Sequence, residues 1–217
     1  MSDAYAVIGW PLGHTLSPVM HQAALAELGL DATYTALPTP PGAEDDRFND
    51  VRTGALAGLN VTIPHKLAAF RAVDRRTPAA ERTGAVNTVI RDGPRLLGDN
   101  TDPYGFIQAL RQFGRFDPAG ASVVVLGAGG AARAAVLALL DSGARQILVA
   151  NRTEARAHDL VNDIEPANST PIRACGLDDN RLCQDLSAAQ LLVNTTSVGM
   201  SGGPAPAASP VSAGSLH

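Results

Sequence analysis

Short apolar runs alternate with segments of helical character in the first hundred residues. Four runs have the length and composition of strands, at residues 4–9, 33–37, 59–63 and 85–90. A helix is predicted from residue 17 to 28, with Ser17 as its N-cap and Pro18 in the first helical position. Another helix is expected to begin at Pro64. Strands that alternate with helices in this way predict an α/β fold with a mostly parallel sheet.

The second half begins with a predicted helix from Pro103 to Phe113, which we expect to bridge two domains. The run at 122–126 is almost entirely apolar, which is typical of a buried strand in a parallel sheet. Further strands are predicted at 146–150, 170–174 and 191–195. From Ser201 onward the chain is rich in Ser, Gly, Pro and Ala without periodicity, which predicts a loop. The expected domains are therefore 1–102 and 103–217.

A glycine-rich turn joins the strand at 122–126 to a predicted helix that ends near Asp141. Gly127, Gly129 and Ala132 fit the G-x-G-x-x-G/A pattern, and the strand–turn–helix context that this pattern requires is present. Such turns also occur for packing alone, but in this context they favour a dinucleotide site in a doubly wound, Rossmann-type domain. The residues expected to bind the cofactor here are Gly127, Ala128, Gly129, Gly130, Ala131 and Ala132.

The residues after the next strand indicate which dinucleotide binds. An NAD site usually has an acidic residue here for the ribose 2′-hydroxyl, whereas this chain has Asn151, Arg152 and Thr153. Arg156 follows Arg152 by four residues, and on one helix the two guanidinium groups would face the same way and bind a phosphate. The alternative is a solvated arginine pair. We therefore expect NADP (NADPH) as the cofactor.

Composition narrows the classes of partner. The 217 residues carry a net charge of −4, so no overall basic field attracts nucleic acid or an anionic membrane. No apolar run approaches the roughly 18 residues that span a bilayer, and the first residues lack the pattern of a signal peptide. Cys175 and Cys183 have neither metal-ligand nor redox-motif spacing. We expect a cytoplasmic protein, monomeric or homodimeric, that binds small molecules and no metal.

Several polar clusters in the first half lie where strands are expected to run into helices, the usual ligand-binding edge of α/β proteins. They are the segments 13–18, 60–66, 84–88 and 98–103. Taken singly, their residues could be helix caps or solvated surface groups. In this order, and followed by the glycine turn and Asn-Arg-Thr, the clusters resemble the shikimate dehydrogenase family, and the resemblance runs from Tyr5 to about Met200.

The resemblance implies an enzyme that reversibly reduces 3-dehydroshikimate to shikimate with NADPH, in chorismate and aromatic amino-acid biosynthesis. Thr15 and Ser17 match the hydroxyl residues that hold the substrate carboxylate. Asn60, Thr62 and Asn87 match residues that form hydrogen bonds to the substrate. The family usually has serine where this chain has Thr15. Because threonine adds a methyl group to the hydroxyl, quinate remains an alternative substrate.

Lys66 and Asp102 match the catalytic pair of the family. Reduction of a carbonyl by hydride leaves an alkoxide, which needs a proton donor within hydrogen-bond reach. Lys66 or a bound water can supply this proton, and Asp102 can orient the lysine and accept a bond from a substrate hydroxyl. The intact pair argues against the other alternative, a metabolite-binding module without catalysis. Thr195 lies in the matching segment 194–200 and is expected to contact the cofactor.

The resemblance ends near Met200. The family continues with further strands of the nucleotide sheet and with a late glutamine, tyrosine and glycine that have no counterpart here. Four strands are predicted in the second half, whereas the full doubly wound arrangement has six. We therefore expect an incomplete nucleotide domain in a C-terminally truncated chain, the alternative being a shortened relative.

Overall fold

The computed structural model describes residues 2–164, 170–201, 203 and 205–212. The chain forms two compact units, Met1–Thr101 and Asp102–His217. Across the described ranges, the helices are all too short or too polar to cross a membrane.

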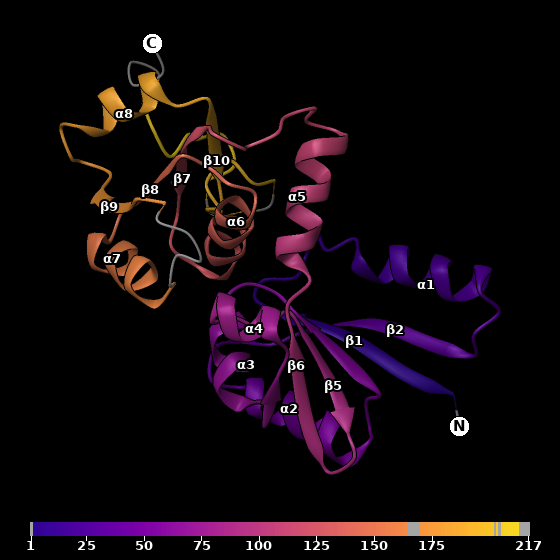
Figure 1. The fold of residues 1–217 in the computed structure, drawn as a ribbon. Helices are drawn as coiled ribbons and strands as arrows, with labels where there is room; N and C mark the ends of the chain where they lie inside the picture. Colours follow the sequence, from indigo (N-terminus) through magenta and orange to yellow (C-terminus); the bar gives the residue numbers. More distant parts are fainter. Residues whose placement is uncertain (1, 165–169, 202, 204, 213–217) are drawn as a thin grey trace. The chain divides into compact units, whose positions relative to one another are not determined.

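The first unit contains a six-stranded sheet with the strand order β2-β1-β3-β5-β6-β4 (Figure 1). β1 is parallel to β2 and β3, and β4 is parallel to β6, whereas β5 is antiparallel to both of its neighbours. The expectation of a mostly parallel α/β sheet is therefore confirmed. Its elements are β1 (Asp3–Gly9), α1 (Ser17–Glu27), β2 (Ala32–Pro38), α2 (Glu44–Thr53), β3 (Gly58–Val61), α3 (Lys66–Ala72), β4 (Arg75–Arg76), α4 (Pro78–Thr83), β5 (Thr88–Asp92) and β6 (Arg95–Asp99).

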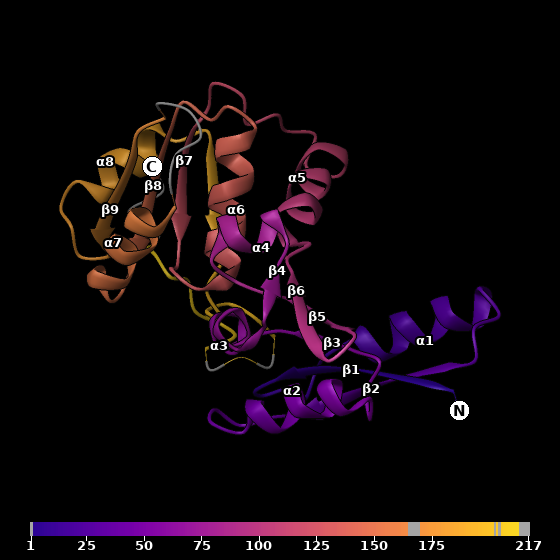
Figure 2. The same cartoon turned by 60° about the horizontal axis from the view of Figure 1, so that its bottom comes forward.

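Helices cover both faces of this sheet, α1 on one and α2 and α3 on the other (Figure 2). Successive side chains of a strand point to opposite faces, so β1 contributes side chains to the hydrophobic clusters on both faces of the sheet. Ala6 and Ile8 pack with Phe48 of α2, in the larger hydrophobic cluster. Val7 packs with Tyr34 of β2 and with Leu25 of α1 on the opposite face.

The strand predicted at 85–90 is wrong at its start, because β5 begins at Thr88. The backbone of Val86 donates to the carbonyl of Lys66, and that of Asn87 to the carbonyl of Asp99, so these residues cross between elements before the strand begins. The hairpin partner β6 was not predicted. Its signal was the Asp-Gly pair at the end of β5, where Gly93 has φ +62°.

Two helix starts also differ from the prediction. Leu16, and not Ser17, is the N-cap of α1, and Ser17 is already helical. α3 begins at Lys66 rather than at Pro64, because the His65 N–H donates to the Thr62 carbonyl in a turn that follows β3. The predicted strand at 59–63 correspondingly ends at Val61.

The second unit contains a four-stranded, wholly parallel sheet with the order β10-β7-β8-β9. α5, α6 and α7 pack on one face of it and α8 on the other, so it is wound on both sides. Its elements are α5 (Asp102–Gln112), β7 (Ser122–Leu126), α6 (Gly130–Asp141), β8 (Gln146–Asn151), α7 (Glu154–Asp163), β9 (Ile172–Gly176), α8 (Leu182–Ala188) and β10 (Leu191–Asn194).

All four strands predicted in this half are present in its described part. β7 has the predicted bounds, whereas β9 begins two residues later than predicted. An isolated bridge pairs Ala205 of the predicted loop with Val198, which precedes the loop. Residues 202, 204 and 213–217 of that loop lie outside the described residues.

Candidate active site

In the first sheet, four strand ends meet at one edge. These are the strand ends that adjoin the predicted substrate residues. β1 and β3 end at this edge, β5 begins there, and β6 ends there. The register pairs Asn60 with Thr88, and Thr88 with Asp99, in a row across three strands. The segments that adjoin these strand ends contain the other candidates of this unit, Thr15, Ser17, Thr62, Lys66 and Asn87.

Two hydroxyl groups lie side by side at the start of α1. Thr15 Oγ1 donates to Ser17 Oγ over 3.2 Å, and the backbone N–H of Ser17 donates to Thr15 Oγ1 over 3.3 Å. The prediction of Ser17 as N-cap is therefore wrong, since Leu16 is the N-cap and the Ser17 N–H is itself bound by the Thr15 hydroxyl. Both hydroxyls can rotate to donate to an acceptor placed between them, which suits a carboxylate.

Asn60, on β3, has a fixed side-chain amide. Its Oδ1 accepts a hydrogen bond of 2.7 Å from the Tyr34 hydroxyl. Its Nδ2 lies 3.3 Å from Thr88 Oγ1 and 3.4 Å from the carbonyl of Asn87. Thr62 follows β3, and its backbone N–H donates to the Ile8 carbonyl over 2.8 Å, which continues the pairing of β3 with β1.

A second amide, that of Asn87 just before β5, is buried and forms hydrogen bonds through both its nitrogen and its oxygen. Its Nδ2 donates to Thr101 Oγ1 over 2.9 Å. Its Oδ1 accepts from the Thr88 hydroxyl over 2.9 Å and from the Thr101 backbone over 3.1 Å. Asn60, Thr88, Asn87 and Thr101 thus form one continuous polar network, called the amide row below, in which each amide has a defined orientation.

Lys66 is the first residue of α3, and His65 before it is 2% exposed. His65 Nε2 lies 2.7 Å from the Thr39 carbonyl, and its Nδ1 lies 3.7 Å from Glu44 Oε2. The Lys66 carbonyl accepts from the Val86 backbone over 3.0 Å. These hydrogen bonds hold the backbone before and at the lysine, and they therefore fix the position of the Lys66 Cα.

The other member of the predicted pair, Asp102, is the first residue of α5 and belongs to the second unit. It follows Thr101, whose side chain and backbone both contact Asn87. The polar network of the first unit therefore extends to the residue immediately before Asp102.

In the second unit, β7 runs into α6 through the predicted glycine turn. Gly127 has φ +110°, and a Cβ there would lie 2.5 Å from Thr195 Oγ1. Gly129 has φ −95°, and a Cβ there would meet no atom of the described residues within 4 Å. The first glycine is thus required by the protein's own packing, whereas the second leaves open space beside the helix start.

The start of α6 has the features of an anion site. Gly129 is the N-cap and has no side chain to cap the helix, and the first turn contains no acidic residue. Gly130, Ala131 and Ala132 follow, of which Ala131 is exposed and Ala132 is buried in the core. Backbone N–H groups at a helix start attract phosphate when no side chain satisfies them. Half-buried Ala128 completes the turn.

Thr195 closes the turn from the neighbouring strand. Its hydroxyl donates to the Leu126 carbonyl over 2.7 Å, and its backbone N–H donates to the same oxygen over 2.9 Å. It therefore has a structural contact with the end of β7, next to Gly127.

The arginine pair is arranged differently from the prediction. α7 begins at Glu154, so Arg152 precedes the helix and only Arg156 lies on it, and the expected helical i, i+4 geometry is wrong. The chain turns between strand and helix, with Asn151 Nδ2 donating to the Thr153 carbonyl over 2.8 Å. Both arginines are nevertheless exposed within one short segment after β8.

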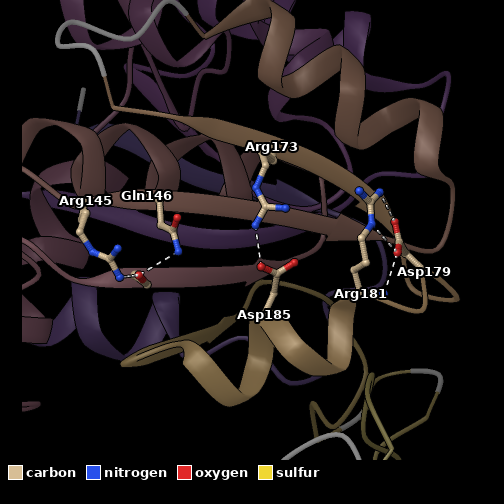
Figure 3. Close-up of polar contacts among 7 residues, drawn as sticks. Arg145, Gln146, Arg173, Asp179, Arg181 and Asp185 are labelled. Atoms are coloured by element: carbon tan, nitrogen blue, oxygen red, sulfur yellow. Dashed lines mark hydrogen bonds and ion pairs between the residues drawn. The ribbon is translucent and has the colours of Figure 1, made fainter.

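A cavity of about 320 Å³ lies beside β9, between α7 and α8. Figure 3 shows that its charged groups are engaged with one another. Arg173 donates to Asp185 over 2.6 Å, and Arg181 folds back onto Asp179. Burial, with nearby carboxylates, raises the pKa of the Cys175 thiol in its lining to about 11, which keeps the thiol protonated at neutral pH. The cavity therefore offers a weaker candidate site than the two strand edges.

Sequence reasoning missed the residues that hold the amide row, above all Tyr34 and Thr101. Tyr34 is separated from Asn60 by 26 positions, and no local pattern links them. Thr101 lay inside a recognised cluster, but its role depends on a bond to Asn87 that only the sheet register creates.

Comparison with known proteins covers both units. Residues 7–89 match the shikimate dehydrogenase substrate binding domain, and residues 108–198 match the family described as shikimate / quinate 5-dehydrogenase. The NADP(+) shikimate dehydrogenase of Geobacter metallireducens is 46% identical over 195 residues, which are 89% of this chain and 68% of that protein. That of Methanopyrus kandleri is 43% identical over 199 residues, 92% of this chain and 69% of that protein.

A solved structure agrees with the sequence matches. Shikimate 5-dehydrogenase from Thermus thermophilus, in complex with NADP(H) and shikimate, is 41% identical with a TM-score of 0.80. The similarity covers 99% of this chain and 75% of that one. With a relative at 46% identity that is matched over more than two thirds of its length, the chain belongs to the shikimate dehydrogenase family.

Proposed function

We propose that this chain catalyses the reversible, NADPH-dependent reduction of 3-dehydroshikimate to shikimate. The observation that carries the proposal is the single edge of the first sheet that gathers a hydroxyl pair, an amide row and Lys66. The hydroxyl pair suits a carboxylate, the amides suit a ring with several hydroxyls, and the lysine suits a carbonyl that is reduced. The curated relatives are NADP-dependent shikimate dehydrogenases, which supports the same assignment.

In this proposal the first unit binds the substrate. Thr15 and Ser17 donate to its carboxylate, while Asn60, Thr62 and Asn87 bind its ring hydroxyls. Because both amides are held by their neighbours, substrate binding costs little side-chain entropy. The defined amide orientations also discriminate between donors and acceptors on the ring, which is how a site selects among similar polyols.

Lys66 and Asp102 are the proposed catalytic residues. As hydride reaches the carbonyl carbon, negative charge develops on its oxygen, and the Lys66 ammonium stabilises this charge and donates a proton. Asp102 orients the lysine and accepts a hydrogen bond from a substrate hydroxyl. In the reverse direction the same lysine accepts the proton of the shikimate hydroxyl.

The second unit fits NADP. The uncapped start of α6 and the open space at Gly129 suit a pyrophosphate, and Arg152, Arg156, Asn151 and Thr153 suit a 2′-phosphate. We assign Gly127, Ala128, Gly130, Ala131, Ala132 and Thr195 to the same site, with Gly127 and Thr195 shaping the turn. When bound, NADPH supplies the hydride.

The test is a steady-state assay of the complete gene product with shikimate and NADP+. We expect turnover of roughly 1–10³ s⁻¹, a range typical of enzymes. NAD+ in place of NADP+ should lower kcat/KM, because it lacks the 2′-phosphate that Arg152 binds. Absence of NADP-dependent oxidation of shikimate would reject the proposal.

A second candidate substrate is quinate. It is favoured by Thr15, whose methyl group changes the carboxylate end of the site, and by the shikimate / quinate family that residues 108–198 match. The ratio of kcat/KM for shikimate and quinate decides between them. We further propose that the protein is cytoplasmic, which cell fractionation tests. We also propose that it is a monomer or homodimer whose partners are these small molecules, and sedimentation analysis tests the oligomeric state.

A further inference from the structure

Tyr34 connects two parts of the proposed substrate site. Its side chain is 5% exposed and lies on β2, next to β1. On one side its hydroxyl donates to Asn60 Oδ1 over 2.7 Å. On the other its ring stacks on His21 of α1, with the ring centroids 4.2 Å apart and the planes inclined by 11°. The phenol thus lies between the helix that begins at Ser17 and the strand that carries Asn60.

The hydroxyl and the Asn87 carbonyl together hold the Asn60 carboxamide in one orientation. The two ends of a carboxamide have nearly the same shape, and only their hydrogen-bond partners distinguish them. The Asn87 carbonyl can only accept, so it selects the NH₂ end, and the Tyr34 hydroxyl donates to the oxygen at the opposite end. In this structure Nδ2 consequently lies near Thr88 Oγ1, at 3.3 Å, and near the Asn87 carbonyl, at 3.4 Å.

The phenol is suited to act as a permanent donor. Burial raises the pKa of Tyr34 to about 12, so the hydroxyl retains its proton throughout the physiological range. An unpaired buried hydroxyl is costly, so Tyr34 and Asn60 stabilise each other's orientation.

We propose that Tyr34 is a positioning residue for substrate recognition, because its hydroxyl holds the Asn60 amide in its orientation while its ring, stacked on His21, holds α1 and its hydroxyl pair. This inference rests on the proposed function, which assigns Asn60, Thr15 and Ser17 to the substrate. It adds a residue that does not touch the substrate and acts through those that do.

The test is Tyr34→Phe, which keeps the ring and removes the hydroxyl. The matched control is Tyr5→Phe, the same change in a half-buried tyrosine of the same hydrophobic cluster. Loss of one neutral hydrogen bond predicts a rise of about fivefold in the KM for shikimate. The KM for NADP+ should stay within about twofold of wild type, and the control should change neither KM.

A double-mutant cycle separates positioning from general loosening of the fold. In an Asn60→Ala background, Tyr34→Phe should have no further effect on shikimate binding, because the group that it orients is absent. An equal effect in both backgrounds, or an unchanged KM for shikimate in the single variant, would overturn the inference.

A readout without substrate distinguishes this inference from the proposed function. The side-chain amide NMR signals of Asn60, assigned by their loss in Asn60→Ala, should shift and exchange faster with solvent in Tyr34→Phe, and stay in place in Tyr5→Phe. Unchanged signals in Tyr34→Phe refute the positioning role whatever the substrate is. Failure of the wild-type protein to bind shikimate refutes the proposed function and leaves the amide result to decide the role of Tyr34.

Discussion

Arg133 on α6 donates to Asp163 at the end of α7, with 2.5 Å between Nη2 and Oδ2. The Arg133 side chain is 9% exposed, and its Nε is buried without a hydrogen-bond partner among the described residues. The pair connects two helices, and the residues proposed to bind the pyrophosphate and the 2′-phosphate lie at the starts of these helices. Burying a guanidinium costs free energy unless it is paired with an opposite charge. The ion pair with Asp163 offsets this cost for Arg133.

Asp163→Ala should therefore lower the free energy of unfolding by about 1–3 kcal/mol, measured by urea denaturation. The effect is moderate because Asp163 itself is 58% exposed and its charge is screened. Asp159→Ala, an exposed acidic residue of the same helix, serves as the control and should change stability by less than about 0.5 kcal/mol. Equal stability of the two variants would show that the pair contributes nothing.

The two glycines of the cofactor turn should respond differently to alanine. Gly127→Ala forces a Cβ to within 2.5 Å of Thr195 Oγ1 at φ +110°, so we expect a loss of about 1–3 kcal/mol in unfolding free energy. The Cβ of Gly129→Ala meets no atom of the described residues, so the variant should cost less than about 1 kcal/mol. It should nevertheless weaken NADP binding by occupying the approach to the helix start. Urea denaturation and NADP titration measure both, and normal NADP affinity in Gly129→Ala would contradict the proposed site.

The parts of the fold that the sequence predicts best are those whose signal is local. β7 has its predicted bounds because a run such as Val123–Leu126 is buried on both faces and apolar throughout. The glycine turn is likewise local, since strand, turn and helix are contiguous. β5 was misplaced because Ala85 and Val86 are as apolar as the strand, although their backbone bonds go elsewhere.

The contacts that complete the candidate site, and those that hold its helices together, join residues far apart in the chain. Tyr34 and Asn60 are 26 positions apart, and Arg133 and Asp163 are 30 positions apart. Each pair depends on which strands or helices become neighbours, which no local periodicity encodes. The family resemblance predicted Asn60 as a site residue but carried no information about the tyrosine that orients it.

Arg152→Ala should reduce the preference for NADP over NAD by roughly ten- to a hundredfold in kcat/KM, since a charge-assisted hydrogen bond contributes about 1.5–3 kcal/mol. Because Arg152 lies outside α7 and Arg156 lies on it, each variant needs its own measurement. Arg156→Ala should have the same direction, and the double variant shows whether the two bind one phosphate. A parallel loss with NADP and NAD would place both residues outside the 2′-phosphate site.

Lys66→Ala should lower kcat by about 10²–10⁴-fold, the usual contribution of general acid–base catalysis, while the affinity for shikimate changes little. Arg71→Ala on the exposed side of the same helix is the control for a general effect of removing a positive charge from α3. Stopped-flow turnover and calorimetric binding separate chemistry from affinity. A Lys66→Ala protein with near-normal kcat would exclude the lysine from proton transfer.

The raised pKa of Tyr34 predicts a loss of stability at alkaline pH. The phenol titrates at 10.0 in an unperturbed chain and at about 12 when folded, so between these values the native state binds more protons than the unfolded state. The free energy of unfolding therefore falls as pH rises through this window, by up to roughly 3 kcal/mol, and the contribution is fully present below pH 10. Tyr34→Phe removes the ionisable group, so its unfolding free energy should fall less between about pH 9.5 and 11.5 than that of the wild type. Urea denaturation at several pH values gives the two slopes. Identical slopes for Tyr34→Phe and the wild type would mean that the phenol ionises as readily in the folded protein as in water, and that burial does not raise its pKa.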